Sequence, residues 1–182
     1  YLADQARRFN PHSYYVGQGC DVSMFDKSLI ESLPDDIINI PKPIIGYIGV
    51  IFDLRLDIDI LLHIAKSRPD WQVVLVGPED EVFKNSALHQ QKNVWFLGPK
   101  KMEELPQYLM AFDVAINPQK LNEVTIGNYP RKIDEYLAMG KPTVATRTKA
   151  MEVFDGYTYL AENKEQYVEM IGQALREDNE EK

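Results

Sequence analysis

The chain has 182 residues, of which 45% are hydrophobic and 26% charged, and its formal net charge is −8 with a sequence pI near 4.9. This composition is that of an ordinary globular protein, and the length makes one compact domain over residues 1–182 the simplest expectation. An acidic chain without a global basic footprint argues against nucleic-acid binding. No stretch reaches the roughly 18 uninterrupted apolar residues that span a bilayer.

The cysteine and histidine content limits the cellular setting and the chemistry. Cys20 has no second cysteine to pair with, which excludes an intrachain disulfide and favours a reducing, cytoplasmic location. Three histidines without ligand-like spacing predict that there is no metal site. The chain begins with Tyr1 rather than Met, and its first eight residues lack an apolar signal core. We therefore expect a piece of a longer protein.

The first 43 residues carry weak structural signals. Residues 12–25, HSYYVGQGCDVSMF, indicate a strand and a turn that complete a preceding unit. Residues 29–43 contain three prolines and no hydrophobic periodicity, so they predict a connector.

From residue 43 onward the pattern alternates between strands and helices. Short apolar runs predict strands at residues 43–50, 71–78, 93–99, 113–118, 141–146 and 156–161. Amphipathic segments predict helices at residues 57–69, 102–112 and 164–178, and a further helix between Pro130 and Gly140. Strands separated by helices form right-handed crossovers, so the sequence predicts an α/β fold: a Rossmann-like parallel β-sheet with helices on both faces.

Glycines follow three of the predicted strands, at Gly49, Gly77 and Gly98. In open parallel sheets, ligands bind at the carboxyl ends of the strands. A single glycine at such a place serves a strand-to-helix turn equally well. Their recurrence at one edge favours close approach of the backbone to a ligand.

The segment YPRKIDEYLAMGKPTVAT, residues 129–146, joins a helix to a strand. Pro130 suits a first helical turn, and Gly140 suits the residue that ends a helix. Ile133, Tyr136 and Leu137 have the spacing of one apolar helix face directed at the sheet. All of these residues are explained by folding alone.

Two charged residues of the same segment are not explained in this way. Lys132 and Glu135 lie three positions apart, and an exposed pair of this kind stabilises a helix by only about 0.2–0.5 kcal/mol. A helix start offers free N–H groups and a positive dipole end to anions, and the preceding loop with Gly127 and Asn128 is rich in amides. Lys132 suits a diphosphate and Glu135 the vicinal hydroxyls of a ribose. The local charge agrees, since five basic residues accompany two acidic ones between positions 131 and 149: Arg131, Lys132, Lys141, Arg147 and Lys149 with Asp134 and Glu135.

The same segment resembles the P-x-K-x-x-E-Y-L-A-x-G-K-P-V-V-A-T signature of family 4-like retaining glycosyltransferases with the GT-B architecture. Segments YYVGQGCDVSMF, PIIGYIGV, RPDWQVVLVGP and NVWFLGPKKMEELPQYLMAFDVAINP also resemble that family and occur in its order. The resemblance covers roughly residues 10–175.

The resemblance implies that the chain is the C-terminal, donor-binding half of such an enzyme, without the N-terminal acceptor domain. It implies that Glu135 binds the ribose and that Lys132 lies near the diphosphate, assisted by amides of residues 125–128. The loop after Gly98 would lie near the base. No cofactor is implied, because the nucleotide-diphosphate sugar is the substrate and a metal-independent reaction is expected. Partners would be this donor and the missing N-terminal domain, and peripheral membrane contact through that domain is compatible with the resemblance.

Two positions differ from the family pattern. The first family glutamate, eight residues before the second, corresponds to Gly127, with Glu123 four residues earlier. The arginine that often follows the first strand's glycine is Val50, while Arg55 falls near a position that often holds a phosphate-binding lysine. Arg55 either takes that role or pairs with Asp57 or Asp59.

Three functions remain open from the sequence. The first is the donor-binding domain of a glycosyltransferase, the second is half of a nucleotide-sugar epimerase, and the third is a catalytically inactive nucleotide-sugar-binding module. A dinucleotide oxidoreductase is disfavoured, because no G-x-G-x-x-G follows any predicted strand. The base, the sugar, the acceptor and the stereochemical outcome are left open.

Overall fold

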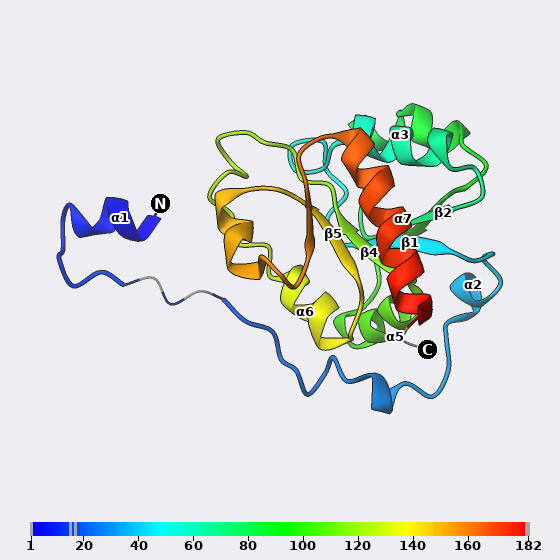
Figure 1. Ribbon diagram of the computed structural model, residues 1–182, viewed down its shortest axis with the longest axis horizontal. Helices are drawn as coiled ribbons and strands as arrows, with labels where there is room; N and C mark the ends of the chain where they lie inside the picture. Colours follow the sequence, from blue (N-terminus) through cyan, green and yellow to red (C-terminus); the bar gives the residue numbers. More distant parts are fainter. Residues whose placement is uncertain (1, 15, 17, 181–182) are drawn as a thin grey trace.

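The computed structural model describes residues 2–14, 16 and 18–180, and their core is a parallel sheet of six strands in the order β3-β2-β1-β4-β5-β6 (Figure 1). The strands are β1 Ile44–Ile48, β2 Gln72–Val76, β3 Val94–Gly98, β4 Val114–Asn117, β5 Thr143–Thr146 and β6 Tyr159–Ala161. Each of the six strands predicted from the sequence is present, and all neighbouring pairs are parallel. The predicted Rossmann-like α/β fold is confirmed.

Helices connect the strands. The α-helices are α1 Leu2–Arg7, α2 Asp35–Ile38, α3 Ile58–Ser67, α4 Glu81–Lys84, α5 Leu105–Ala111, α6 Lys132–Ala138 and α7 Lys164–Glu180. Short 3-10 helices cover Lys27–Leu29, Ala87–Gln90, Met102–Glu104 and Lys149–Phe154. The helix predicted at 102–112 is thus a 3-10 turn followed by α5, with Pro106 in the first turn of α5. In the part of the chain that is described, no helix combines the length and the apolar character needed to cross a membrane.

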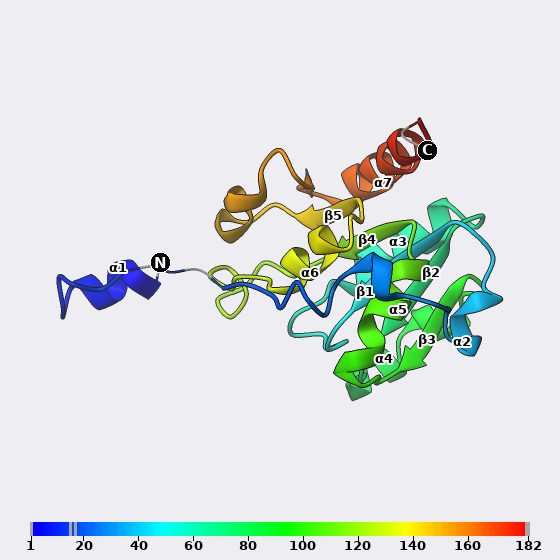
Figure 2. The same cartoon turned by 90° about the horizontal axis from the view of Figure 1, so that it is seen from below.

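Two apolar layers enclose the sheet (Figure 2). On one face, α3 and α7 pack against alternate strand residues such as Ile45 and Val73. On the other face, α2, α5 and α6 pack against the residues between them, such as Ile44 and Val74. Strands β1 and β2 are buried on both sides because helices cover both faces of the sheet, which explains their nearly continuous apolar sequences.

The N-terminal segment differs from the expectation. The described residues of 12–25 form no strand, and Tyr15 and Gly17 lie outside the described residues. In Figures 1 and 2 α1 lies apart from the sheet, whereas Phe25 at the end of this stretch is buried in the core. Among the described residues of the stretch, none pairs with a strand of the sheet. The predicted connector at 29–43 contains α2, whose Ile37 is buried in the core.

Helix α6 begins and ends close to the predicted positions. It starts at Lys132, two residues after Pro130, whose carbonyl accepts the first turn's hydrogen bond from the Ile133 N–H at 2.9 Å. Gly140 has φ +65° and follows the C-cap. The N–H groups of Gly140 and Lys141 donate to the carbonyls of Leu137 and Tyr136, both at 2.9 Å, which is the Schellman arrangement.

Strands β1 and β4 separate before their carboxyl ends, because their pairing stops at Gly46 and Ala115. Two buried tyrosines form hydrogen bonds with backbone groups at the strand ends, Tyr136 in this gap and Tyr167 where β4 meets β5. The hydroxyl of Tyr136, on α6, accepts a hydrogen bond from the Ile48 N–H at 3.0 Å. The hydroxyl of Tyr167, on α7, donates to the carbonyl oxygen of Asn117 at 2.8 Å. Backbone groups that the sheet leaves unpaired are therefore satisfied by side chains.

This arrangement predicts a measurable cost for the change Tyr136→Phe. The variant keeps the ring but leaves the buried N–H of Ile48 without its partner, so we expect the free energy of unfolding to fall by about 1–3 kcal/mol. Urea denaturation followed by circular dichroism measures this change. Tyr157→Phe, at a side chain that is 76% exposed, is the control and should have no effect. Equal stability of the two variants would contradict the role given to the Tyr136 hydroxyl.

Candidate functional site

A pocket of about 430 Å³ lies at the carboxyl end of β1, next to the gap between β1 and β4. Strands β1 to β3 follow one another toward one edge of the sheet, and strands β4 to β6 follow one another toward the other edge. The gap between β1 and β4 is therefore the topological switch point, where open α/β sheets bind ligands. The pocket is lined by the end of β1 and its loop, the start of α5, and the segment that enters α6: Tyr47, Ile48, Gly49, Val50, Arg55, Met102, Leu105, Asn128, Tyr129, Pro130, Arg131, Lys132 and Glu135.

Lys132 reaches from the first turn of α6 across the end of β1. Its Nζ donates to the Tyr47 hydroxyl at 2.8 Å and lies 4.4 Å from the centroid of the Tyr47 ring. Gly49 permits this approach, because a Cβ on that residue would lie 3.1 Å from Nζ. Gly49 also has φ +142°, which other residues rarely adopt. The ammonium group is thus held over the strand end by an aromatic side chain rather than by an acid.

Glu135 lies one turn deeper and is only 7% exposed. Burial raises the pKa of its carboxyl group, although the nearby charges of Arg131 and Lys132 oppose that shift. Its ion pair is with Arg131, whose Nε lies 3.3 Å from Oε1. The exposed Lys132–Glu135 pair considered from the sequence is therefore not formed. A carboxylate kept at this depth has capacity left to accept hydrogen bonds from a ligand.

Arg55 lines the same pocket from the loop after β1 and is exposed. The alternative in which it pairs with Asp57 or Asp59 is wrong. Asp57 instead caps α3, accepting hydrogen bonds from the N–H groups of Asp59 and Ile60 at 2.9 and 3.2 Å. Among the described residues, the guanidinium of Arg55 has no acidic partner in the structure. It adds a positive charge to the pocket from the loop after β1.

The structure gathers five of the seven predicted site residues around this pocket: Gly49, Arg55, Asn128, Lys132 and Glu135. Gly98 does not line it, because β3 is separated from β1 by β2. Gly127 lies in an exposed turn with Glu123, and neither lines the pocket. The loop after Gly98 contributes indirectly, since it leads to Met102 and Leu105, which form an apolar wall of the pocket.

Some pocket residues were not predicted as site residues. Arg131 stands four residues before Glu135, and this i, i+4 spacing of opposite charges was a usable signal. Tyr47 had no usable signal, because a tyrosine within an apolar strand is indistinguishable from a core residue until the fold brings α6 over it.

The strand order and the charged pocket at the reversal point define an open α/β domain with a ligand-sized pocket at the carboxyl ends of its strands. The family model described as "Glycosyl transferases group 1" matches residues 42–177. This range contains the whole sheet and every residue that lines the pocket. The chain belongs to this family.

Individual relatives agree with this assignment. TuaH of Bacillus subtilis strain 168, named as a teichuronic acid biosynthesis glycosyltransferase, is 35% identical over 107 residues, which are 57% of this chain and 26% of TuaH. The structure resembles Anabaena HepE, solved with UDP and glucose, with a TM-score of 0.69 and 19% identity over 88% of this chain and 47% of HepE. For sucrose-phosphate synthase from Thermosynechococcus elongatus, the TM-score is 0.65 and the identity is 20%. The match covers 98% of this chain and 48% of the synthase. The chain thus spans about a quarter of TuaH and about half of these solved proteins.

The environment of Glu135 predicts how the variant Glu135→Gln behaves. A raised carboxyl pKa means that the ionised form costs stability above that pKa, and that this cost disappears as the pH falls through it. Arg131 is 52% exposed and stays solvated when its partner is neutralised. We therefore expect Glu135→Gln to be at least as stable as the unaltered protein at pH 7.5, with any advantage shrinking as the pH is lowered.

Urea denaturation at several pH values measures this difference. The matched control is Glu169→Gln, an exposed glutamate on α7, which should leave stability unchanged at each pH. A loss larger than about 1 kcal/mol in Glu135→Gln, the net worth of a typical hydrogen bond, would show that folding depends on the carboxylate.

Proposed function

We propose that this chain is the donor-binding part of a glycosyltransferase and that its pocket binds a nucleoside-diphosphate sugar. The observation that carries the proposal is the arrangement around one strand end: two cations, Lys132 and Arg55, face a pocket that also contains the buried carboxylate of Glu135. Family membership and the solved complexes of HepE with UDP and with UDP-glucose support it.

Each part of the ligand has a chemically suitable partner in the proposal. The ammonium of Lys132 and the guanidinium of Arg55 bind the diphosphate, whose oxygens form strong hydrogen bonds with charged donors. Glu135 accepts hydrogen bonds from the ribose hydroxyls. Val50, Met102 and Leu105 offer an apolar surface to the base.

The chemistry proposed is transfer of the sugar to an acceptor with departure of the nucleoside diphosphate. Negative charge grows on the leaving diphosphate as the glycosidic bond breaks, and prepositioned cations stabilise it most in that state. In this proposal Lys132 and Arg55 provide that stabilisation, so the reaction needs no metal ion. The acceptor site belongs to a part of the protein beyond this chain. The family match and the similar proteins give no support to the epimerase alternative.

Calorimetric titration of the protein with UDP, GDP and NAD tests the proposal. We expect a nucleoside diphosphate to bind and NAD not to bind. If neither UDP nor GDP binds at millimolar concentration, the proposal is wrong.

Variants of Lys132 and Glu135 test which residue binds the diphosphate and which binds the ribose. Lys132→Met should weaken UDP binding about ten- to hundredfold, the worth of charge-assisted hydrogen bonds, and should change uridine binding less than about twofold. Lys66→Met, at an exposed lysine on α3, is the control. Glu135→Gln should weaken UDP more than 2′-deoxy-UDP. Equal losses for UDP and uridine in Lys132→Met would remove the diphosphate role.

A further inference from the structure

The loop that carries Arg55 lies beside the loop that follows β4. These two segments, residues 49–57 and 118–128, contribute Arg55 and Asn128 to the pocket. Leu56 and Gln119 form an antiparallel bridge. The Lys120 N–H donates to the Arg55 carbonyl at 2.8 Å, and the Asp57 N–H donates to the Pro118 carbonyl at 2.9 Å. The backbone of Arg55 is thus attached directly to the second loop.

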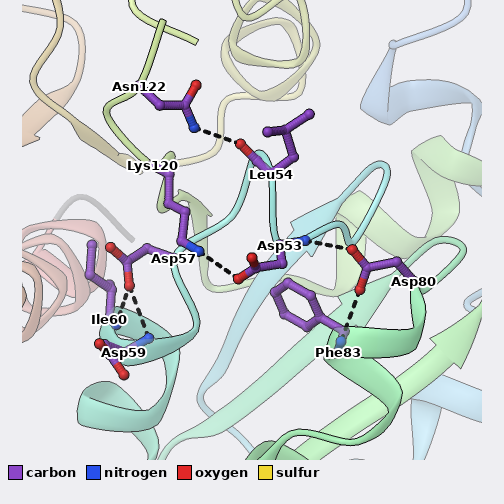
Figure 3. Close-up of polar contacts among 9 residues, drawn as sticks. All are labelled: Asp53, Leu54, Asp57, Asp59, Ile60, Asp80, Phe83, Lys120 and Asn122. Atoms are coloured by element: carbon purple, nitrogen blue, oxygen red, sulfur yellow. Dashed lines mark hydrogen bonds and ion pairs between the residues drawn. The ribbon is translucent and has the colours of Figure 1, made fainter. Parts of the chain in front are cut away.

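Side chains of the second loop hold the first one at adjacent positions (Figure 3). Lys120 Nζ lies 2.5 Å from Asp53 Oδ1, and Asn122 Nδ2 donates to the Leu54 carbonyl at 2.8 Å. Figure 3 shows Lys120 and Asn122 reaching the loop from the same side, one toward Asp53 and the other toward Leu54. The two residues before Arg55 are therefore each held by a side chain of the other loop.

Asp53 is fixed from its other side as well. Its N–H donates to Asp80 Oδ2 at 2.8 Å, and Asp80 Oδ1 accepts from the Phe83 N–H at the start of α4 at 2.9 Å. Lys120 therefore contacts a residue whose backbone is already hydrogen-bonded to the loop after β2. Because Asp53 is held from both sides, its ion pair with Lys120 fixes the relative position of the two loops.

Apolar burial does not hold this part of the loop. Ile51 and Leu56 are buried at its two ends, whereas Phe52 and Leu54 between them are 38% and 57% exposed. The Lys120–Asp53 pair is about one third exposed on both sides, and such pairs add little to overall stability. We therefore expect the Lys120–Asp53 pair to affect the position of this loop and not the overall stability of the fold.

We propose that Lys120 and Asn122 are positioning residues that hold Arg55 at the pocket. The proposal rests on the proposed function, because Arg55 needs a position only if it binds the diphosphate. A loop that becomes ordered only when the ligand binds loses conformational entropy, and this loss weakens binding. A loop that is already held in place avoids the loss. Lys120 and Asn122 touch the loop and not the ligand, so their influence on binding passes through Arg55.

A comparison of single and double variants by UDP titration tests this. Lys120→Met and Asp53→Asn should each weaken UDP about three- to tenfold, and the double variant should be no weaker than either single one, because both remove the same contact. Uridine binding should stay unchanged. In the Arg55→Met background, Lys120→Met should have no further effect. Lys164→Met, at an exposed lysine on the same edge, is the control and should bind UDP normally.

Other results identify other roles. If Lys120→Met weakens UDP while Asp53→Asn does not, Lys120 binds the phosphate itself and the positioning role is wrong. A loss that persists in the Arg55→Met background contradicts it equally. Hydrogen exchange of residues 50–56 is the second readout, and it should accelerate in Lys120→Met without ligand. Unaltered protein that fails to bind UDP or GDP refutes the proposed function, whereas a Lys120→Met variant that binds UDP as tightly as the unaltered protein refutes the positioning role alone.

Discussion

The separation of β1 from β4 is the constraint on which the site depends. Their pairing ends at Gly46 and Ala115, so the last residues of both strands have backbone groups that the sheet does not pair. Leaving such groups buried and unpaired costs about 1–3 kcal/mol each. The Tyr136 hydroxyl satisfies the Ile48 N–H in this gap, and the Tyr167 hydroxyl bonds to Asn117 and Thr146 at the adjacent ends of β4 and β5. Burial raises the pKa of both tyrosines, so these hydroxyls keep their protons at physiological pH.

The same contact sets the position of the charged residues. Tyr136 joins α6 to the end of β1, and the residues one and four positions before it are Glu135 and Lys132. Lys132 consequently meets Tyr47 and Gly49 at the strand end, while Glu135 is buried beside the pocket. Folding explains Tyr136 and Gly140 completely. It does not explain a buried carboxylate whose pKa is raised, and this is the group that we propose accepts hydrogen bonds from a ligand's hydroxyl groups.

The sequence predicted the sheet well because its strands are continuous apolar runs, which burial on both faces requires. It failed at residues 12–25, since a strand pattern forms a strand only where a neighbour is available to pair with it. The recurrence of glycines after strands and the family resemblance predicted Gly98 at the site, but neither reveals that β2 lies between β3 and β1. Helical spacing put Lys132 and Glu135 at one end of α6 and favoured Arg131 as the partner of Glu135, but only the packing of the fold brings Tyr47 to Lys132.

A crystal structure of the protein with UDP tests the central claim most directly, namely that the gap between β1 and β4 is the donor site. We expect diphosphate oxygens within hydrogen-bond distance of Lys132 Nζ and ribose hydroxyls within hydrogen-bond distance of the Glu135 carboxylate. UDP bound elsewhere would contradict it. The hollow of about 610 Å³ where α3 and α7 begin, whose lining includes Lys120 and Lys164 as well as four acidic residues, is the alternative location that such a structure would reveal.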